Sequence, residues 1–313
     1  MIRLKQNRFS EIEYRSFNLV VAASGFESRA SYQMSRYKGV AQKKIILSFN
    51  DKTDNDIRKI NDDFFERSGF IKYSVDGDLN TFSIIEEIIF SVIKANEQSS
   101  EINIYVDYSS MTRNLYAQII YIIKSIESLK TINIVFGYSH AKYTKSLDDE
   151  ILNRFVEPLF GFCSLSIPIK PTALIICLGN EKNRVYGLQE YFDATTYLFY
   201  SDSSFNNKFS KEVEVVNSEI LSATKPERII KFPMHDMSHT NYLLENICKV
   251  LSNDFRVIIA PCGPKTFTLL ALITSIRFDL GIEVWRISPG KGLPIIEREA
   301  SGEMTFLEVT FNH

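Results

Sequence analysis

The same order of segments occurs twice along this chain of 313 residues. Short apolar runs rich in β-branched residues alternate with longer amphipathic runs, which is typical of β-strands joined by helices into a mainly parallel sheet. Positions that correspond in the two copies, such as Gly25 and Gly179, are separated by a nearly constant offset of about 150 to 158 residues at five places. A constant offset indicates an internal repeat. Two unrelated α/β domains in tandem are the alternative.

The repeat predicts an α/β fold of two tandem Rossmann-like units, each a doubly wound, mainly parallel sheet with the strand order 3-2-1-4-5. The first unit, with a linker helix, is expected at 1–165, with strands at 18–23, 44–49, 71–77, 102–107 and 131–138 and helices at 30–37, 56–69, 80–95 and after Arg113. The second is expected at 166–313, with strands at 173–179, 197–202, 228–233, 256–261 and 282–288 and helices at 205–223, 241–251 and after Lys265. A C-terminal β-hairpin with its turn at Ser301-Gly302 is expected as an edge extension or a dimer contact.

Composition limits the classes of function. With 45% hydrophobic residues, 24% charged residues and a formal net charge of -2, the chain is typical of a globular protein and has no general footprint for duplex nucleic acid. Its four cysteines have neither disulfide nor zinc spacing, which favours the reducing cytoplasm. No apolar run approaches the roughly 20 residues of a membrane span, and the N-terminal stretch lacks the apolar core of a signal peptide. The glycine fingerprint of a dinucleotide site is missing, so no cofactor is expected.

Polar residues concentrate after strand one and after strand four of each copy. In an open sheet of this order, ligands bind over the carboxyl ends of these two strands, where the strand order reverses. The strand-one loops read Gly25-Phe-Glu27-Ser-Arg29 and Gly179-Asn-Glu181-Lys-Asn-Arg184. Glycine allows close backbone approach, Glu can accept from a sugar hydroxyl or base amine, and Arg can clamp a phosphate. The alternative is a solvated Glu–Arg pair in a first helical turn.

The strand-four loops each lead into a predicted helix. The first contains Asp107, Ser109, Ser110, Thr112 and Arg113, and the second contains Cys262, Gly263, Lys265 and Thr266. Hydroxyls, backbone amides and a cation at a helix N-terminus suit a phosphate or another anion, although Ser and Thr are also common as ordinary helix caps. Asp107 could serve as a general base, a ribose contact or a structural acceptor for loop amides. The second copy has Ala260 at that position, so any role of the carboxylate is confined to one copy.

Three further groups of residues lie near predicted strand ends. His235, Asp236 and His239 follow strand three of the second copy and allow either a metal site or a loop with a helix cap, and the cap is favoured because no further ligand is evident. His140 and Lys291 follow strand five of the two copies. They are candidate lid residues over the crevice, and an ordinary turn is the alternative.

With both loops in view, the chain resembles the CARF group of Rossmann-like nucleotide-sensing domains and the related SAVED domains, which look like two CARF units fused in one chain. The resemblance covers roughly 18–140 and 172–292 and is carried by the strand-one and strand-four loops quoted above. It implies a cytoplasmic receptor in prokaryotic antiviral defence. The receptor would bind a cyclic oligonucleotide in the crevice between the two units and signal to a separate effector protein.

Two enzymatic alternatives use the same loops. In the first, the chain is a metal-independent phosphodiesterase that degrades such a messenger, with Ser109, Ser110, Arg113 and Lys265 stabilising the developing charge. In the second, it is a transferase acting on a nucleoside or sugar phosphate, with Asp107 and Glu27 on the sugar. A pure interaction scaffold is the alternative without a ligand.

Overall fold

The computed structural model describes residues 2–51, 53–76, 78–126, 130–144, 155–164, 167–181, 184–202, 207–278, 280–288 and 297–312. The chain divides into two compact units, Met1–Lys142 with Pro294–His313, and Tyr143–Leu293. The C-terminal segment therefore belongs to the first unit, whereas the sequence analysis assigned 166–313 to the second. Within the described residues, no helix is long and apolar enough to cross a membrane.

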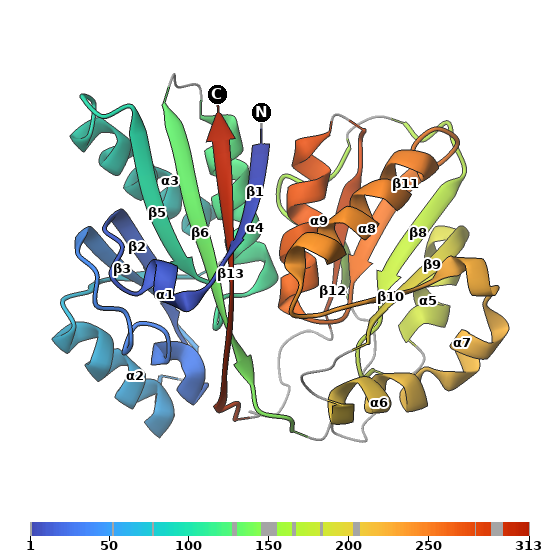
Figure 1. Ribbon diagram of the computed structural model, residues 1–313, viewed down its shortest axis with the longest axis horizontal. Helices are drawn as coiled ribbons and strands as arrows, with labels where there is room; N and C mark the ends of the chain where they lie inside the picture. The colour runs from blue at the N-terminus through green and yellow to red at the C-terminus, as the bar shows by residue number, and fades with distance from the viewer. Residues whose placement is uncertain are drawn as a thin grey trace. The chain divides into compact units, whose positions relative to one another are not determined.

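The first unit contains a 7-stranded sheet (Figure 1). In sheet order the strands are β4 (Ile71–Val75), β3 (Ala41–Phe49), β2 (Phe17–Ser24), β5 (Glu101–Asp107), β6 (Thr131–Ala141), β13 (Ala300–Asn312) and β1 (Ile2–Asn7). From β4 to β6 all neighbours are parallel, which is the predicted order 3-2-1-4-5. Strands β13 and β1 are added antiparallel beyond β6.

The second unit contains a 6-stranded sheet of the same design. In sheet order the strands are β10 (Ile229–Phe232), β9 (Ala194–Ser201), β8 (Thr172–Cys177), β11 (Arg256–Pro261), β12 (Glu283–Ser288) and β7 (Phe155–Pro158). The first five are parallel and again follow 3-2-1-4-5, and β7 is antiparallel at the edge. Two mainly parallel sheets of one strand order confirm the predicted Rossmann-like fold class, and the shared order is what an internal repeat requires.

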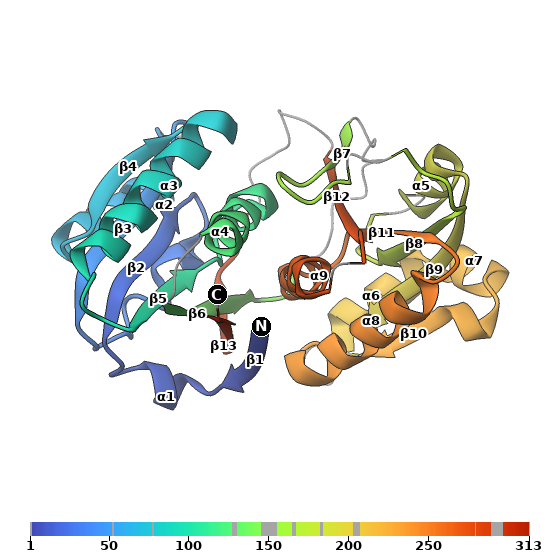
Figure 2. The same ribbon diagram turned by 90° about the horizontal axis from the view of Figure 1, so that it is seen from above.

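Helices connect the parallel strands. In the first unit these are α1 (Phe9–Ile12), the 3-10 helix η1 (Ser28–Ser31), α2 (Asp56–Arg67), α3 (Asp78–Ala95) and α4 (Arg113–Ser125). In the second they are α5 (Arg184–Phe192), α6 (Asn207–Val216), α7 (Ser218–Ala223), the 3-10 helix η2 (Pro226–Arg228), α8 (Met237–Leu251) and α9 (Lys265–Arg277). In each unit, the helices before and after strand four pack together: α3 lies beside α4, and α8 beside α9 (Figure 2).

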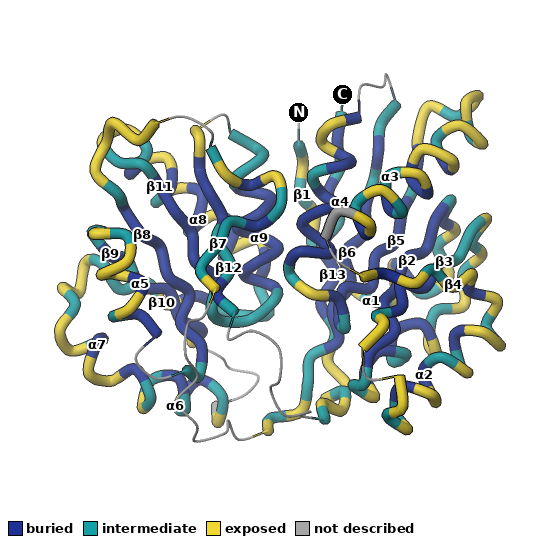
Figure 3. Tube along the Cα trace, turned by 180° about the vertical axis from the view of Figure 1, so that it is seen from behind, coloured by how far each residue is buried: buried dark blue, intermediate teal, exposed yellow. Residues whose placement is uncertain are grey.

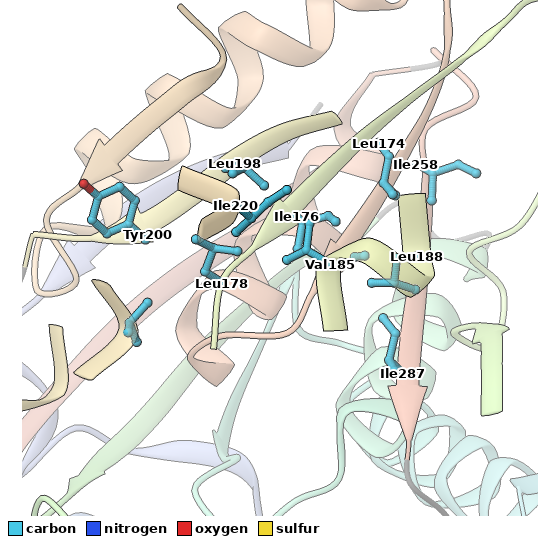
Figure 4. Close-up of a cluster of buried hydrophobic side chains, with 12 residues drawn as sticks. Leu174, Ile176, Leu178, Val185, Leu188, Leu198, Tyr200, Ile220, Ile258 and Ile287 are labelled. Carbon is cyan, nitrogen blue, oxygen red and sulfur yellow. The ribbon is translucent and has the colours of Figure 1, made fainter. Parts of the chain in front are cut away.

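The central strands are buried and the connecting helices expose one side (Figure 3). The residues of β8 from Ala173 to Cys177 are fully buried, as expected for a parallel strand covered on both faces. One face of this sheet packs its aliphatic side chains against α5 and α7, and Ile176 lies among them with Val185 and Ile220 (Figure 4). The apolar runs that made the strands recognisable in the sequence are thus the core of each unit.

The C-terminal strand pair is formed differently from the expected hairpin. Ser301 and Gly302 lie inside the continuous strand β13, which pairs with β6 and β1 instead of folding back on itself. The pairing of β13 with β6 shifts in register between Ala300 and Met304, and Gly302 has a positive φ of 102°. This irregularity lies where the sequence predicted the turn at Ser301-Gly302. Part of the expected first hairpin strand lies outside the described residues.

Two segments between strands also differ from expectation. The predicted helix at 30–37 is replaced by η1 and a series of turns, in which the side chains of Arg29 and Gln33 are buried. The predicted helix at 205–223 is broken at Asn217 into α6 and α7. The predicted linker helix is also corrected: its residues 155–158 form strand β7, which pairs with β12 of the second unit although 1–165 was assigned to the first, and 145–154 lie outside the described residues.

Candidate functional site

The strand-one and strand-four loops of the first unit lie against each other. A Cβ atom built on the buried residue Gly25 would lie 3.4 Å from the Cβ of Ser110 and 3.7 Å from its Oγ. From α2, the Asn61 side-chain amide donates to the carbonyl oxygens of Gly25 and Glu27, both at 2.9 Å. The two predicted loops are therefore brought together over the ends of β2 and β5, and a buried amide fixes the first of them.

Arg29 is a buried cation at this position, and its side chain has no exposed surface. Its Nε donates to Glu27 Oε2 at 2.7 Å, and its Nη1 donates to the Tyr138 hydroxyl at 2.9 Å and to the Ser139 carbonyl at 3.0 Å. Burial alone would lower the pKa of Arg29, but Tyr138 and Glu27 raise it, so the guanidinium stays charged. The Glu–Arg pair that was the alternative after strand one is formed, with Arg29 buried and Glu27 partly exposed.

Asp107 is a structural acceptor. It ends β5, is 1% exposed, and its Oδ1 accepts from Gln33 Nε2 at 2.6 Å, from the Ser109 hydroxyl at 2.6 Å and from the Ser109 amide at 3.0 Å. Ser109 Oγ in turn accepts from Gln33 at 2.8 Å and from the Ser139 amide at 2.9 Å. This network ties β5 to β6, so Asp107 and Ser109 shape the loop from within.

The remainder of the strand-four loop leads into α4. Thr112 is its N-cap, and its side chain accepts from the Leu115 amide at 3.2 Å, which is the ordinary cap that the sequence analysis weighed. Arg113 begins the helix and is half-buried. Ser110 faces Gly25, as described above. Arg113 is thus the cation of this loop that lies partly at the surface, whereas Ser110 Oγ is buried.

Several buried polar atoms around Arg29 have no hydrogen-bond partner in the described structure: Arg29 Nη2, Tyr108 Oη, Ser110 Oγ and Ser139 Oγ. Three of them belong to one neighbourhood, because Arg29 contacts Ser139 and Tyr138, and the Tyr138 ring stacks on Tyr108 with ring centroids 5.2 Å apart. Burial and the neighbouring Tyr116 raise the pKa of Tyr108 well above its ordinary value, so its hydroxyl keeps its proton. Buried groups normally find partners, so this donor-rich group suits water or an anionic ligand.

The equivalent loops of the second unit also meet. A Cβ on Gly179 would lie 2.6 Å from the carbonyl oxygen of Cys262, and one on Gly263 would lie 2.5 Å from that of Leu178. Any side chain at either position would force the two loops apart, so both positions require glycine. The Asn217 side chain donates to the Gly179 carbonyl at 2.9 Å. This contact repeats the one between Asn61 and Gly25.

The two predicted cations of the second unit each begin a helix. Arg184 begins α5, is 7% exposed, and pairs with Glu181 at 3.3 Å. Lys265 begins α9 and is half-buried, whereas Thr266 is buried in the first turn. Pro264 is the N-cap and contributes no side-chain hydrogen bond. Lys265 therefore lies at the positive, N-terminal end of α9, where the first backbone amides receive no hydrogen bond from the side chain of the N-cap residue.

The other predicted residues have different positions. Asp236 is the N-cap of α8 and accepts from the His239 amide at 2.8 Å, which is the cap interpretation of this cluster. Among the described residues, no three His, Cys, Asp or Glu side chains are grouped to hold a metal ion. His140 lies near the end of β6, with its ring 5.0 Å from that of Tyr138. Lys291 lies outside the described residues.

Sequence reasoning missed the residues that hold the loops: Gln33, Asn61, Tyr138, Ser139 and Asn217. None of them lies in a strand-one or strand-four loop. The repeat offset gave a usable signal, since Asn61 and Asn217 are separated by the same interval as the landmarks of the two copies. The local sequence gives no sign that the polar side chains of Gln33, Tyr138 and Ser139 are buried and hold the loops.

The fold and these loops define two Rossmann-like units with polar switch points. No protein-family model matches the chain. No curated protein sequence matches it either.

Proposed function

We propose that the protein binds a phosphorylated nucleotide of the cyclic oligonucleotide class at the switch-point loops of its units. In each unit, a ligand phosphate would be held by the N-terminal end of the helix after strand four, α4 or α9, with Arg113 or Lys265 as the cation. Binding would be signalled to a separate effector protein in prokaryotic antiviral defence, as the resemblance to CARF and SAVED domains implies.

The observation that carries this proposal is the recurrence of one arrangement in both units. In each, the strand-one loop touches the strand-four loop, an Asn amide holds the first, and a cation begins the helix after the second. Backbone amides and a cation at a helix N-terminus favour phosphate oxygens. The unpartnered buried donors around Arg29 add capacity for an anionic ligand in the first unit.

The test is thermal unfolding of the purified chain with linear and cyclic oligonucleotides, mononucleotides and sugar phosphates. A ligand present at 100 times its Kd stabilises the folded state by about 2.7 kcal/mol, which raises the Tm by several degrees. Arg113→Ala combined with Lys265→Ala should abolish the shift, whereas Lys124→Ala, at the opposite end of α4, should retain it. An unchanged shift in the double variant would refute the assigned site.

The same samples distinguish the enzymatic alternatives. Mass spectrometry of the incubated oligonucleotide would reveal cleavage if the chain is a phosphodiesterase. A shift with mononucleotides or sugar phosphates alone would favour a transferase. No shift with any compound would contradict the proposal.

A further inference from the structure

Asn180 lies in the strand-one loop of the second unit, between the candidate residues Gly179 and Glu181. Its side-chain Nδ2 donates to Glu212 Oε2 on α6 at 3.0 Å. The backbone of the same loop is held by Asn217, which directly follows α6 and donates to the Gly179 carbonyl at 2.9 Å. The segment from α6 to Asn217 therefore fixes both the backbone and a side chain of this loop.

The contact with Glu212 also fixes which end of the Asn180 amide faces the helix. A carboxylate accepts hydrogen bonds but does not donate them, so it holds the amide nitrogen and turns the carbonyl oxygen, Oδ1, away. Among the described residues, Asn180 Oδ1 is buried and has no hydrogen-bond partner. Buried acceptors normally find partners, so this position favours a molecule that brings a hydrogen-bond donor.

Glu212 is itself held in place. The Tyr143 hydroxyl hydrogen-bonds the Glu212 carboxylate, and burial, the charge of Glu212 and this bond all raise the pKa of Tyr143. At the corresponding position the first unit has Phe26, one residue after Gly25 as Asn180 is one residue after Gly179. A phenylalanine side chain cannot accept a hydrogen bond, so the arrangement is confined to the loop of the second unit.

We infer that Asn180 determines the specificity of the second unit: its Oδ1 accepts from a hydroxyl or an amine of the bound nucleotide, and Glu212 is a positioning residue that keeps the amide turned for this contact. This role rests on the proposed function and deepens it, because the nucleotide must then present a donor as well as a phosphate. The 2′-hydroxyl of ribose and the exocyclic amines of bases are such donors.

The first experiment measures, by calorimetric titration, the Kd of dinucleoside monophosphates in pairs that differ in one donor. The pairs are adenine and hypoxanthine, cytosine and uracil, and ribose and 2′-deoxyribose. The wild type should bind the donor member of at least one pair about tenfold more tightly than the other member. Asn180→Leu keeps a similar shape but cannot accept a hydrogen bond, so its preference in that pair should fall below about twofold.

Glu212→Gln separates a positioning role from mere support of the fold. A glutamine amide can accept from Asn180 Nδ2 or donate to its Oδ1, so the Asn180 amide is no longer held in one orientation. The preference should fall to about threefold with little change in Tm, and the side-chain amide signals of Asn180 in the NMR spectrum should move. Glu214→Gln is the matched control, because Glu214 lies on the same helix but pairs with Lys231 at 3.0 Å. It should keep the preference of the wild type.

Two results would overturn the role of Asn180 and leave the proposed function standing. In one, the wild type binds the probes but prefers no donor member; in the other, Asn180→Leu keeps the preference. Either would indicate that water, and not the nucleotide, satisfies Oδ1. If neither these probes nor any cyclic oligonucleotide binds to the wild type, the proposed function and the role of Asn180 both fall.

Discussion

Removing the buried cation Arg29 should destabilise the first unit even without ligand. In Arg29→Met, the methionine fills part of the volume but loses the charge-assisted bond to Glu27 and the hydrogen bonds to the Tyr138 hydroxyl and the Ser139 carbonyl. Leaving one buried polar group unsatisfied costs about 1 to 3 kcal/mol, and breaking a buried ion pair costs about 3 to 5 kcal/mol. Because the Glu27 side chain keeps 15% of its surface exposed and can be partly hydrated, we expect a loss of about 3 kcal/mol.

The assay is native-state hydrogen exchange on peptides from β2 and β5, which reports the opening free energy of this unit without assuming that both units unfold together. Arg67→Met is the matched control: Arg67 also pairs with a carboxylate, Asp63, at 2.7 Å, but its side chain is 80% exposed. It should cost no more than about 0.5 kcal/mol. Equal effects of the two substitutions would show that the buried contacts of Arg29 do not hold the switch point.

Two other measurements test the electrostatics and the burial. Burial alone would raise the pKa of Glu308, but hydrogen bonds from Arg15 and Asn7 hold it below its ordinary value of 4.5. The stabilisation that the Glu308 carboxylate provides is therefore complete above pH 4.5 and is lost as the pH falls through the lower pKa of the folded state. Acid unfolding of Glu308→Gln should accordingly depend less steeply on pH than that of the wild type. Identical unfolding curves would contradict this expectation. Burial, with a smaller effect of Glu245, raises the pKa of Cys248 to about 12, so mass spectrometry after alkylation at pH 8 should find Cys248 unmodified, and substantial labelling in the folded protein would disprove its burial.

The strand order could be predicted because each parallel strand is a short apolar run bounded by polar residues. Such runs must be covered on both faces, and the repeat then restricts the topology. The C-terminal strand could not be assigned in this way. Its alternating pattern predicts an antiparallel strand but does not name the partner, and β6 lies more than 150 residues earlier in the chain.

The sequence predicted where the candidate site lies, but only part of what each of its residues does. Ser109, Ser110 and Thr112 look alike in sequence, since each offers one hydroxyl near a helix start. The fold separates them: Ser109 joins the network of Asp107, Thr112 caps α4, and Ser110 faces Gly25. The local sequence shows how many hydrogen-bond donors a loop contains. Burial and the neighbouring residues determine which of these donors are already hydrogen-bonded within the protein.

The two Asn contacts give the strongest argument that the switch points are maintained as units. Asn61 lies within α2 and Asn217 between α6 and α7, so their local surroundings differ. Each nevertheless donates to the carbonyl oxygen of the strand-one glycine, Gly25 or Gly179. A cap or a core contact need not recur in the second unit, where the helix is interrupted at Asn217. The retained hydrogen bond fixes the loop backbone at the place where a ligand would approach most closely, which is what a binding loop needs and a simple connection does not.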